Sequence, residues 1–158
     1  MLDEFRTAGE LDAYSDDFAV AWEDYSALCD LLAKMKLGGF PRSDSVPMDS
    51  YFIQAEGQIL GDLYIRHRLS AKLEQLGGHI SYMVRPSCRN RGVATAALRL
   101  ALKYLWNLKV ERALVTCKST NIASARVIEK CGGVRSSDAP RPDGVTWRYW
   151  LATTPVTE

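Results

Sequence analysis

The stretch from His79 to Ala97 constrains the fold more than any other part of this 158-residue chain. It begins with an apolar run that is typical of a β-strand and ends at Pro86. A short polar and basic loop follows, and an alanine- and leucine-rich segment typical of a helix then continues to about Trp106. The sequence therefore predicts a strand, a loop and a helix in succession.

The loop of this unit has the properties of an anion site. The first four N–H groups of a helix have no partner within the helix, and the aligned peptide dipoles place about half a positive charge there. Arg89 and Arg91 add full charges, and Gly92 has no Cβ, so a bulky anion can approach the backbone. We therefore expect a phosphate or pyrophosphate at this loop. The alternative is a basic loop that only caps a helix.

Composition excludes several other classes of protein. Hydrophobic residues make up 47% and charged residues 25%, as in an ordinary soluble globular protein, and the net charge of +1 predicts no general attraction to nucleic acid or membrane. No apolar stretch approaches the roughly 20 residues that cross a bilayer, and the N-terminus does not resemble a signal peptide, so we expect a cytoplasmic protein. The spacing of the four cysteines and two histidines suggests neither a zinc site nor a disulfide framework.

The N-terminal third contains one clear helical pattern. Residues 1–15 carry little pattern, and at most a brief strand is expected there. Ser15 then has the position of an N-cap, and the apolar spacing after it predicts a helix that ends before Gly38. Residues 41–47, rich in serine and proline, are expected to form a loop.

The middle of the chain reads as a β-hairpin. Two apolar runs, 51–56 and 58–65, flank Gly57, and a charged loop over 66–77 leads into the strand of the opening stretch. In the helix that follows that strand, polar residues recur at every fourth position and nearly all others are apolar, so most of its circumference is expected to be buried.

The C-terminal third completes an α/β pattern. The order of elements predicts a mixed sheet, antiparallel early and parallel across two crossover helices. The remaining predicted elements are a strand over 110–117, a helix over 121–131 ended by Gly132, a loop that contains Pro140 and Pro142, and a closing strand over 145–152.

The loop also carries a family resemblance. It resembles the acyl-CoA signature of the GNAT superfamily of N-acetyltransferases, which reads Val-x-Pro followed by Gln/Arg-x-x-Gly-x-Gly/Ala. The matching residues are Val84, Pro86, Arg89, Gly92 and Ala94. Their placement between a predicted strand and a predicted helix strengthens the match.

A second motif supports the resemblance. The segment Asn121-x-x-Ser124-x-x-x-Ile128-Glu129-Lys130-x-Gly132 resembles the family's Asn-x-x-Ser-x-x-x-Tyr-Glu-Lys-x-Gly. The similarity extends from about residue 50 to 151 and is strongest to a branch of small bacterial predicted acetyltransferases. It implies a single N-acetyltransferase domain over 1–158 with a GNAT-like α/β fold, in which helices flank a mixed central β-sheet and a strand-loop-helix unit forms the acyl-CoA site.

The resemblance implies acetyl-CoA (CoA) as the cofactor. The loop amides would receive its pyrophosphate, and the strand before the loop would pair its backbone with the pantetheine arm. The residues implied in cofactor binding are Met83, Val84, Arg89, Arg91, Gly92, Val93, Ala94, Thr95, Asn121 and Ser124. Met83 and Val84 can also serve as strand core, and Asn121 and Ser124 can serve instead at the N-terminus of a helix.

The leaving thiolate is where the sequence departs from the family pattern. Many members place a tyrosine at the position of Ile128, and that tyrosine protonates the thiolate, which isoleucine cannot do. A thiol with a pKa near about 8.5 can leave as the anion, so transfer does not require this acid. Water, Tyr82 or Tyr149 remain as proton sources.

The base that deprotonates the amine is equally open. Family bases often lie on the strand before the signature, but the positions that share a face with Val84 contain no strong base. His79 has the wrong parity unless a bulge redirects it, and His67 and Glu56 are further candidates. For both histidines a structural or surface role is the alternative.

Two functions are therefore expected from the sequence. The first is an acetyl-CoA-dependent N-acetyltransferase in which a primary amine attacks the thioester directly in a ternary complex. The second is a non-catalytic acyl-CoA-binding module. The acceptor is expected to be a small-molecule or peptide amine, with no nucleic acid, membrane or metal involved, and homodimers are frequent in the superfamily.

Overall fold

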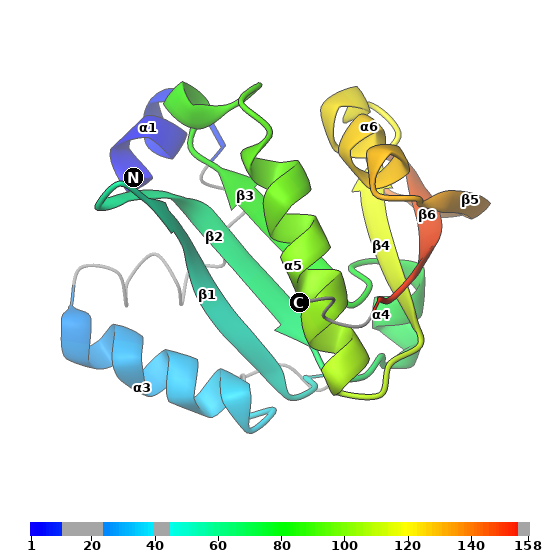
Figure 1. The fold of residues 1–158 in the computed structure, drawn as a ribbon, viewed down its shortest axis with the longest axis horizontal. Helices are drawn as coiled ribbons and strands as arrows, with labels where there is room; N and C mark the ends of the chain where they lie inside the picture. Colours follow the sequence, from blue (N-terminus) through cyan, green and yellow to red (C-terminus); the bar gives the residue numbers. More distant parts are fainter. Residues whose placement is uncertain (11–23, 40–44, 155–158) are drawn as a thin grey trace.

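The computed structural model describes residues 1–10, 24–39 and 45–154 (Figure 1). The first element is a helix, α1 (Leu2–Thr7), so the brief strand expected near the start is wrong. Residues 11–23 lie outside the described part, and with them the predicted N-cap at Ser15. The described helix α3 (Tyr25–Lys36) ends before Gly38 as predicted, and it begins at Asp24, whose carboxylate accepts from the Ser26 N–H at 2.8 Å.

The first sheet contains the predicted hairpin. Strands β1 (Met48–Ala55), β2 (Gln58–Arg66) and β3 (Ile80–Val84) pair antiparallel in the order β1-β2-β3. The predicted loop over 66–77 contains a one-turn helix, α4 (Ala71–Gln75), because Ser70 caps it by accepting from the Leu73 N–H at 3.3 Å. Such a short helix has too few residues to show a periodic pattern in the sequence.

The second sheet holds a strand that the sequence did not predict. Its order is β4 (Arg112–Lys118), β6 (Gly144–Ala152) and β5 (Val134–Arg141), and β5 occupies the segment expected to be a loop with two prolines. This strand is an edge strand and mostly exposed, so it tolerates Pro140 and shows no apolar alternation. The C-terminal elements are η2 (Pro86–Cys88), α5 (Val93–Asn107), β4 (Arg112–Lys118), α6 (Ile122–Lys130), β5 (Val134–Arg141) and β6 (Gly144–Ala152).

The α/β fold is confirmed, but the mixed sheet takes a different form. Both sheets are antiparallel, and the predicted parallel ladder across the crossover helix does not form in the described residues. In the described ranges, strand pairing between the sheets is limited to one isolated bridge, Gly78 with Val115. Beyond that bridge β3 leads to the signature loop and β4 leads to α6.

Helix α5 packs on one face of the sheets (Figure 1) and α3 lies against β1. Leu98, Leu102 and Leu105 of α5 join the main core, while Leu100 is 65% exposed and Trp106 is 39% exposed. The prediction that most of the helix surface would be buried holds for ten of its fifteen residues, which are buried or half-buried, and fails at Leu100 and Trp106. Among the described residues no helix is both long and apolar enough to cross a membrane.

Candidate active site

The signature loop presents an open backbone at the start of α5. Gly92 is the N-cap of this helix and has a φ of +79°, a conformation that favours glycine, and no described side chain caps the first N–H groups. No described atom lies within 4 Å of a Cβ built on Gly92, so the described part of the chain leaves the space above the loop open. The first N–H groups of α5, from Val93 to Thr95, thus face a place that a phosphate could occupy.

The two arginines of the loop lie in different surroundings. The Arg89 guanidinium donates to Glu10 Oε1 at 2.8 Å and to the Val84 carbonyl at 3.0 Å, so its charge is paired with a carboxylate from the start of the chain. Arg91 is exposed. Of the two predicted phosphate ligands, only Arg91 therefore has a free guanidinium among the described residues.

Helix α1 contacts the signature loop through the Glu4 side chain. The Glu4 carboxylate accepts from the Arg85 guanidinium and from the Ser87 N–H, the latter at 3.1 Å. The hydrogen bonds from Arg85 and Ser87 lower the pKa of Glu4 to about 2. These contacts could not be predicted from the sequence, because Glu4 and Arg85 lie 81 positions apart and belong to no shared pattern.

The exposed edge of β3 carries main-chain groups toward β4. At the two ends of the β2–β3 ladder, Arg66 N–H donates to the His79 carbonyl and Arg85 N–H to the Leu60 carbonyl, each at 2.8 Å. Ladder bonds alternate along an antiparallel strand, so Met83 bonds toward β2, whereas Tyr82 and Val84 direct their main-chain groups to the other edge. The Val84 carbonyl on that edge accepts from the Arg89 guanidinium, so the Val84 N–H is the main-chain group of this residue that is left for a ligand.

His79 joins the two sheets. Its N–H donates to the Leu114 carbonyl at 2.7 Å, and its Nδ1 accepts from the Leu114 N–H at 3.0 Å. Burial, together with the nearby Arg66 charge, lowers the pKa of His79 to about 4, so the ring is neutral at neutral pH. Because Nδ1 already accepts from the Leu114 N–H, His79 has the structural role that was the alternative to catalysis.

A cleft of about 490 Å³ opens between β3 and β4 beyond this junction. It is the place where the two sheets diverge, and α6 contributes to its wall. Its lining residues are Leu76, Gly77, Ile80, Ser81, Tyr82, Val115, Thr116, Cys117, Lys118, Asn121, Ser124, Arg141 and Thr146. Three of the predicted site residues, Tyr82, Asn121 and Ser124, are thus brought together here.

Tyr82 and Ser124 form a hydroxyl pair in this cleft, with their oxygens 3.0 Å apart. Burial raises the pKa of Tyr82 to about 12, against the opposing effect of the Ser124 hydrogen bond. The phenol therefore keeps its proton at neutral pH and is suited to donating a hydrogen bond. Asn121 caps α6, since its Oδ1 accepts from the Ser124 N–H at 3.0 Å.

The other tyrosine and Ile128 belong to the core. Tyr149 is 1% exposed and its hydroxyl donates to Glu129 Oε1 at 3.3 Å, outside the cleft lining. Ile128 is fully buried in the main core. Of the protein groups proposed as proton sources, only Tyr82 reaches the cleft.

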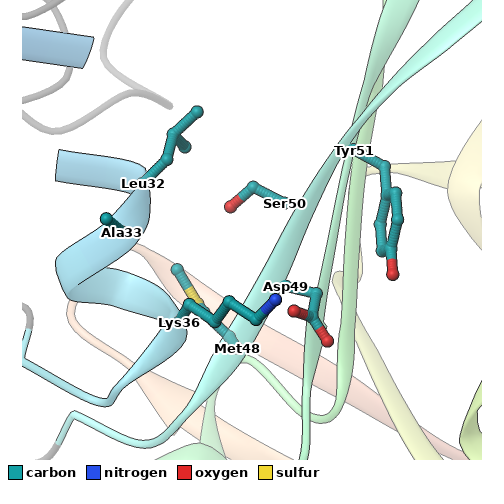
Figure 2. A pocket seen from close by; sticks show the side chains of 7 residues that line it. All are labelled: Leu32, Ala33, Lys36, Met48, Asp49, Ser50 and Tyr51. Atoms are coloured by element: carbon teal, nitrogen blue, oxygen red, sulfur yellow. The ribbon is translucent and has the colours of Figure 1, made fainter. Parts of the chain in front are cut away.

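His67 lies elsewhere. Its Nε2 is 2.7 Å from Asp49 Oδ2, which also accepts from the Tyr104 hydroxyl at 2.6 Å. Asp49 lines a separate hollow of about 310 Å³ between α3 and β1, where Figure 2 shows Ser50 and Met48 turned toward α3. Glu56 is exposed at the hairpin turn. Neither candidate base lines the cleft, and the described residues contain no cluster of three metal-binding side chains.

A family model for the Acetyltransferase (GNAT) domain matches residues 22–134. The chain belongs to the GNAT acetyltransferase family. A search of the curated proteins gives no match.

Solved structures of GNAT proteins share the fold. RimJ from Mycobacterium smegmatis, in complex with CoA-disulfide, superposes with a TM-score of 0.64 at 22% identity over 82% of this chain and 61% of its own. Aminoglycoside acetyltransferase AAC(6')-Ib in complex with coenzyme A gives 0.54 at 18% identity, over 66% of each chain. A chimera of the spermidine N-acetyltransferase SpeG from Vibrio cholerae gives 0.54 at 14% identity over 67% of this chain and 68% of its own. This GNAT chain thus spans less than two thirds of the length of RimJ, and these identities establish the fold alone.

Proposed function

We propose that this GNAT protein is an acetyl-CoA-dependent N-acetyltransferase, in which a primary amine attacks the thioester directly in a ternary complex. The observation that supports it most is the uncapped start of α5, with open space above Gly92, at the end of a strand whose free edge borders a cleft. Coenzyme A offers a diphosphate for the former and an amide-containing arm for the latter. The residues present therefore fit this coenzyme.

The backbone supplies most of the proposed binding. N–H groups from Gly92 to Thr95 would bind the diphosphate, with Arg91 adding charge from the surface. The edge groups of Tyr82 and Val84 would pair with the arm. We assign Arg89 a positioning role instead, because its guanidinium joins Glu10 to the Val84 carbonyl.

Two polar groups would act on the reacting atoms. The Val84 N–H would donate to the thioester oxygen, where a preorganised donor contributes about 3 to 4 kcal/mol to the transition state. Tyr82 would stabilise the departing sulfur by hydrogen bonding. Its pKa of about 12 lies above that of a thiol, about 8.5, so full proton transfer from the phenol to the thiolate is unfavourable.

The amine has to lose its proton without a protein base in the cleft. No carboxylate or imidazole lines the cleft in the described residues, so a water relay would carry the proton. An alkylammonium with a pKa of about 10.4 is deprotonated in only about one molecule in 2,500 at pH 7. We therefore expect kcat/KM to rise with pH toward the pKa of the amine.

The second candidate is a non-catalytic acyl-CoA-binding module. The same two observations favour it: the cleft lining lacks a base, and the family's tyrosine position holds Ile128, which is buried in the core. Such a module would use the signature loop in the same way and leave the thioester intact.

Release of free thiol from acetyl-CoA over a panel of primary amines, with acetyl-CoA binding measured calorimetrically, separates the two candidates. Thiol release that depends on amine, with the acetylated amine found by mass spectrometry, supports the enzyme. Tight binding without turnover of any amine supports the module. Absence of binding would count against both.

The cellular compartment, the acceptor and the oligomeric state are also proposals. Its four cysteines are free, which supports a reducing compartment such as the cytoplasm. The neighbours named for aminoglycoside and spermidine support a small-molecule amine as the acceptor, with a peptide amine as the alternative. A homodimer stays a prediction, and sedimentation equilibrium checks it.

A further inference from the structure

The mouth of the cleft is positively charged. Two side chains in the lining are charged, Lys118 from β4 and Arg141 from β5, and no carboxylate lines the cleft in the part of the chain that the structure describes. Asp143 lies between these two cations, with its carboxylate 2.6 Å from Lys118 Nζ and 2.8 Å from Arg141 Nε. The three side chains together carry one net positive charge, and both terminal nitrogens of the Arg141 guanidinium have no partner among the described residues.

A third cation lies behind the lining. The half-buried Arg66 guanidinium donates to Ser81 Oγ at 3.0 Å and to the Gly78 carbonyl at 3.1 Å. Two carboxylates of the second half, Glu129 and Asp138, pair with other groups. Glu129 accepts from Tyr149, and Asp138 pairs with Arg135.

A buried hydroxyl lies beside the two cations. Thr146 is directly opposite Lys118 in the β4–β6 ladder, it lines the cleft, and it is 1% exposed. Its Oγ1 has no hydrogen-bond partner among the residues that the structure describes. An unsatisfied buried hydroxyl costs about 1 to 3 kcal/mol, so this position is suited to a polar ligand group.

We propose, building on the proposed function, that the acceptor amine also carries a carboxylate or phosphate group, which Lys118, Arg141 and Thr146 bind at the mouth of the cleft. Arg141 can donate two parallel hydrogen bonds to such a group, and Thr146 can donate a third. A second ammonium on the acceptor would instead meet the net positive charge that Lys118, Arg141 and Asp143 carry together. The cleft therefore selects amino acids or phosphorylated amines over polyamines.

Three homologous acceptors test this selectivity: 5-aminopentanoate, pentylamine and 1,5-diaminopentane, which differ only in the group at the far end. Their binding to the protein in the presence of CoA is measured calorimetrically, and their turnover by thiol release. We expect the acid to bind about tenfold more tightly than either of the others, the value of one charge-assisted hydrogen-bonded contact. O-phosphoethanolamine against ethanolamine tests the phosphate form in the same way.

Variants connect the preference to the residues. Arg141→Gln removes the charge and is expected to reduce the preference for the acid to about threefold or less. Arg135→Gln on the same strand, whose arginine pairs with Asp138 outside the cleft, is the matched control and should keep the preference. Thr146→Val tests the hydroxyl with little change of shape.

The outcomes separate this inference from the proposed function. Equal or tighter binding of the diamine would overturn the inference, whether or not any amine is acetylated. A preference for the acid that Arg141→Gln leaves intact would overturn it as well. Tighter binding of the acid without turnover of any acceptor would support the inference and contradict the proposed function.

Discussion

Two glycines, Gly78 before β3 and Gly92 at the start of α5, share a backbone conformation and differ in what surrounds them. Gly92 has a φ of +79° and Gly78 a φ of +66°. A Cβ on Gly92 would enter open space, whereas a Cβ on Gly78 would lie 2.3 Å from the Leu114 carbonyl oxygen. Gly92 keeps room for a ligand and Gly78 lets two sheets touch. The same residue type therefore serves the proposed coenzyme site at the start of α5 and the assembly of the two sheets before β3.

The strongest test of this comparison is Gly92→Glu. The carboxylate adds bulk and negative charge where the diphosphate would lie, and several charge-assisted hydrogen bonds are lost, so acetyl-CoA affinity should fall more than about 100-fold. Gly57→Glu is the matched control. Gly57 has a φ of +76° and nothing within 4 Å of its Cβ position, but it lies in the β1–β2 turn. Unchanged calorimetric affinity in a folded Gly92→Glu protein would count decisively against the coenzyme site.

Gly78→Ala should act on stability. Its Cβ would overlap the backbone of β4, which cannot move without separating the sheets, so we expect a loss of about 3 kcal/mol or more in the free energy of unfolding. Gly92→Ala should cost only about 1 to 2 kcal/mol, the strain of a left-handed alanine. Urea denaturation of both variants compares them, and equal losses would contradict the distinction between the two glycines.

His79→Asn tests the junction through pH. The folded pKa of about 4 lies below the ordinary 6.5, so the unfolded chain binds a proton first, and wild-type stability falls as pH drops from 6.5 toward 4. Between pH 8 and pH 5 this group accounts for about 2 kcal/mol. The asparagine oxygen can still accept from the Leu114 N–H, so the variant should stay folded and lose that part of the slope. Urea titrations at both pH values measure it, and an unchanged slope would refute the account of His79.

Tyr82→Phe tests the proposed hydrogen bond from the Tyr82 hydroxyl to the departing sulfur. Loss of one hydrogen bond to the departing sulfur should lower kcat about tenfold and leave acetyl-CoA affinity unchanged. Tyr104→Phe removes a tyrosine hydroxyl that is hydrogen-bonded to Asp49 outside the cleft, and it should keep wild-type kcat. An equal effect of both variants would mean that the Tyr82 hydroxyl acts only through stability.

The backbone-built part of the site was predictable from the sequence, and the part built from side chains was not. The signature loop is local, since Pro86, Gly92 and the helix after them specify its conformation within ten residues. The acceptor end combines Lys118, Arg141 and Thr146 from three strands, one of which, β5, has no strand pattern. No local spacing could bring these residues together.

The two histidines show that catalytic residues could not be predicted from the sequence either. Their titration range near neutral pH makes them candidates in any sequence. Only the fold shows that His79 bonds to Leu114 and that His67 pairs with Asp49 at the far end of β2. Likewise Arg89 matched the family pattern, but its partner Glu10 lies 79 positions away and could not be inferred.

Strand pairing joins the two halves of this protein at Gly78 and Val115 and nowhere else in the described residues. The signature loop belongs to the first half, whereas Lys118, Arg141 and Thr146 belong to the second, so different sheets supply the proposed coenzyme loop and the proposed acceptor groups. Substitutions in β5 and β6 would therefore change the choice of acceptor and leave the loop as it is.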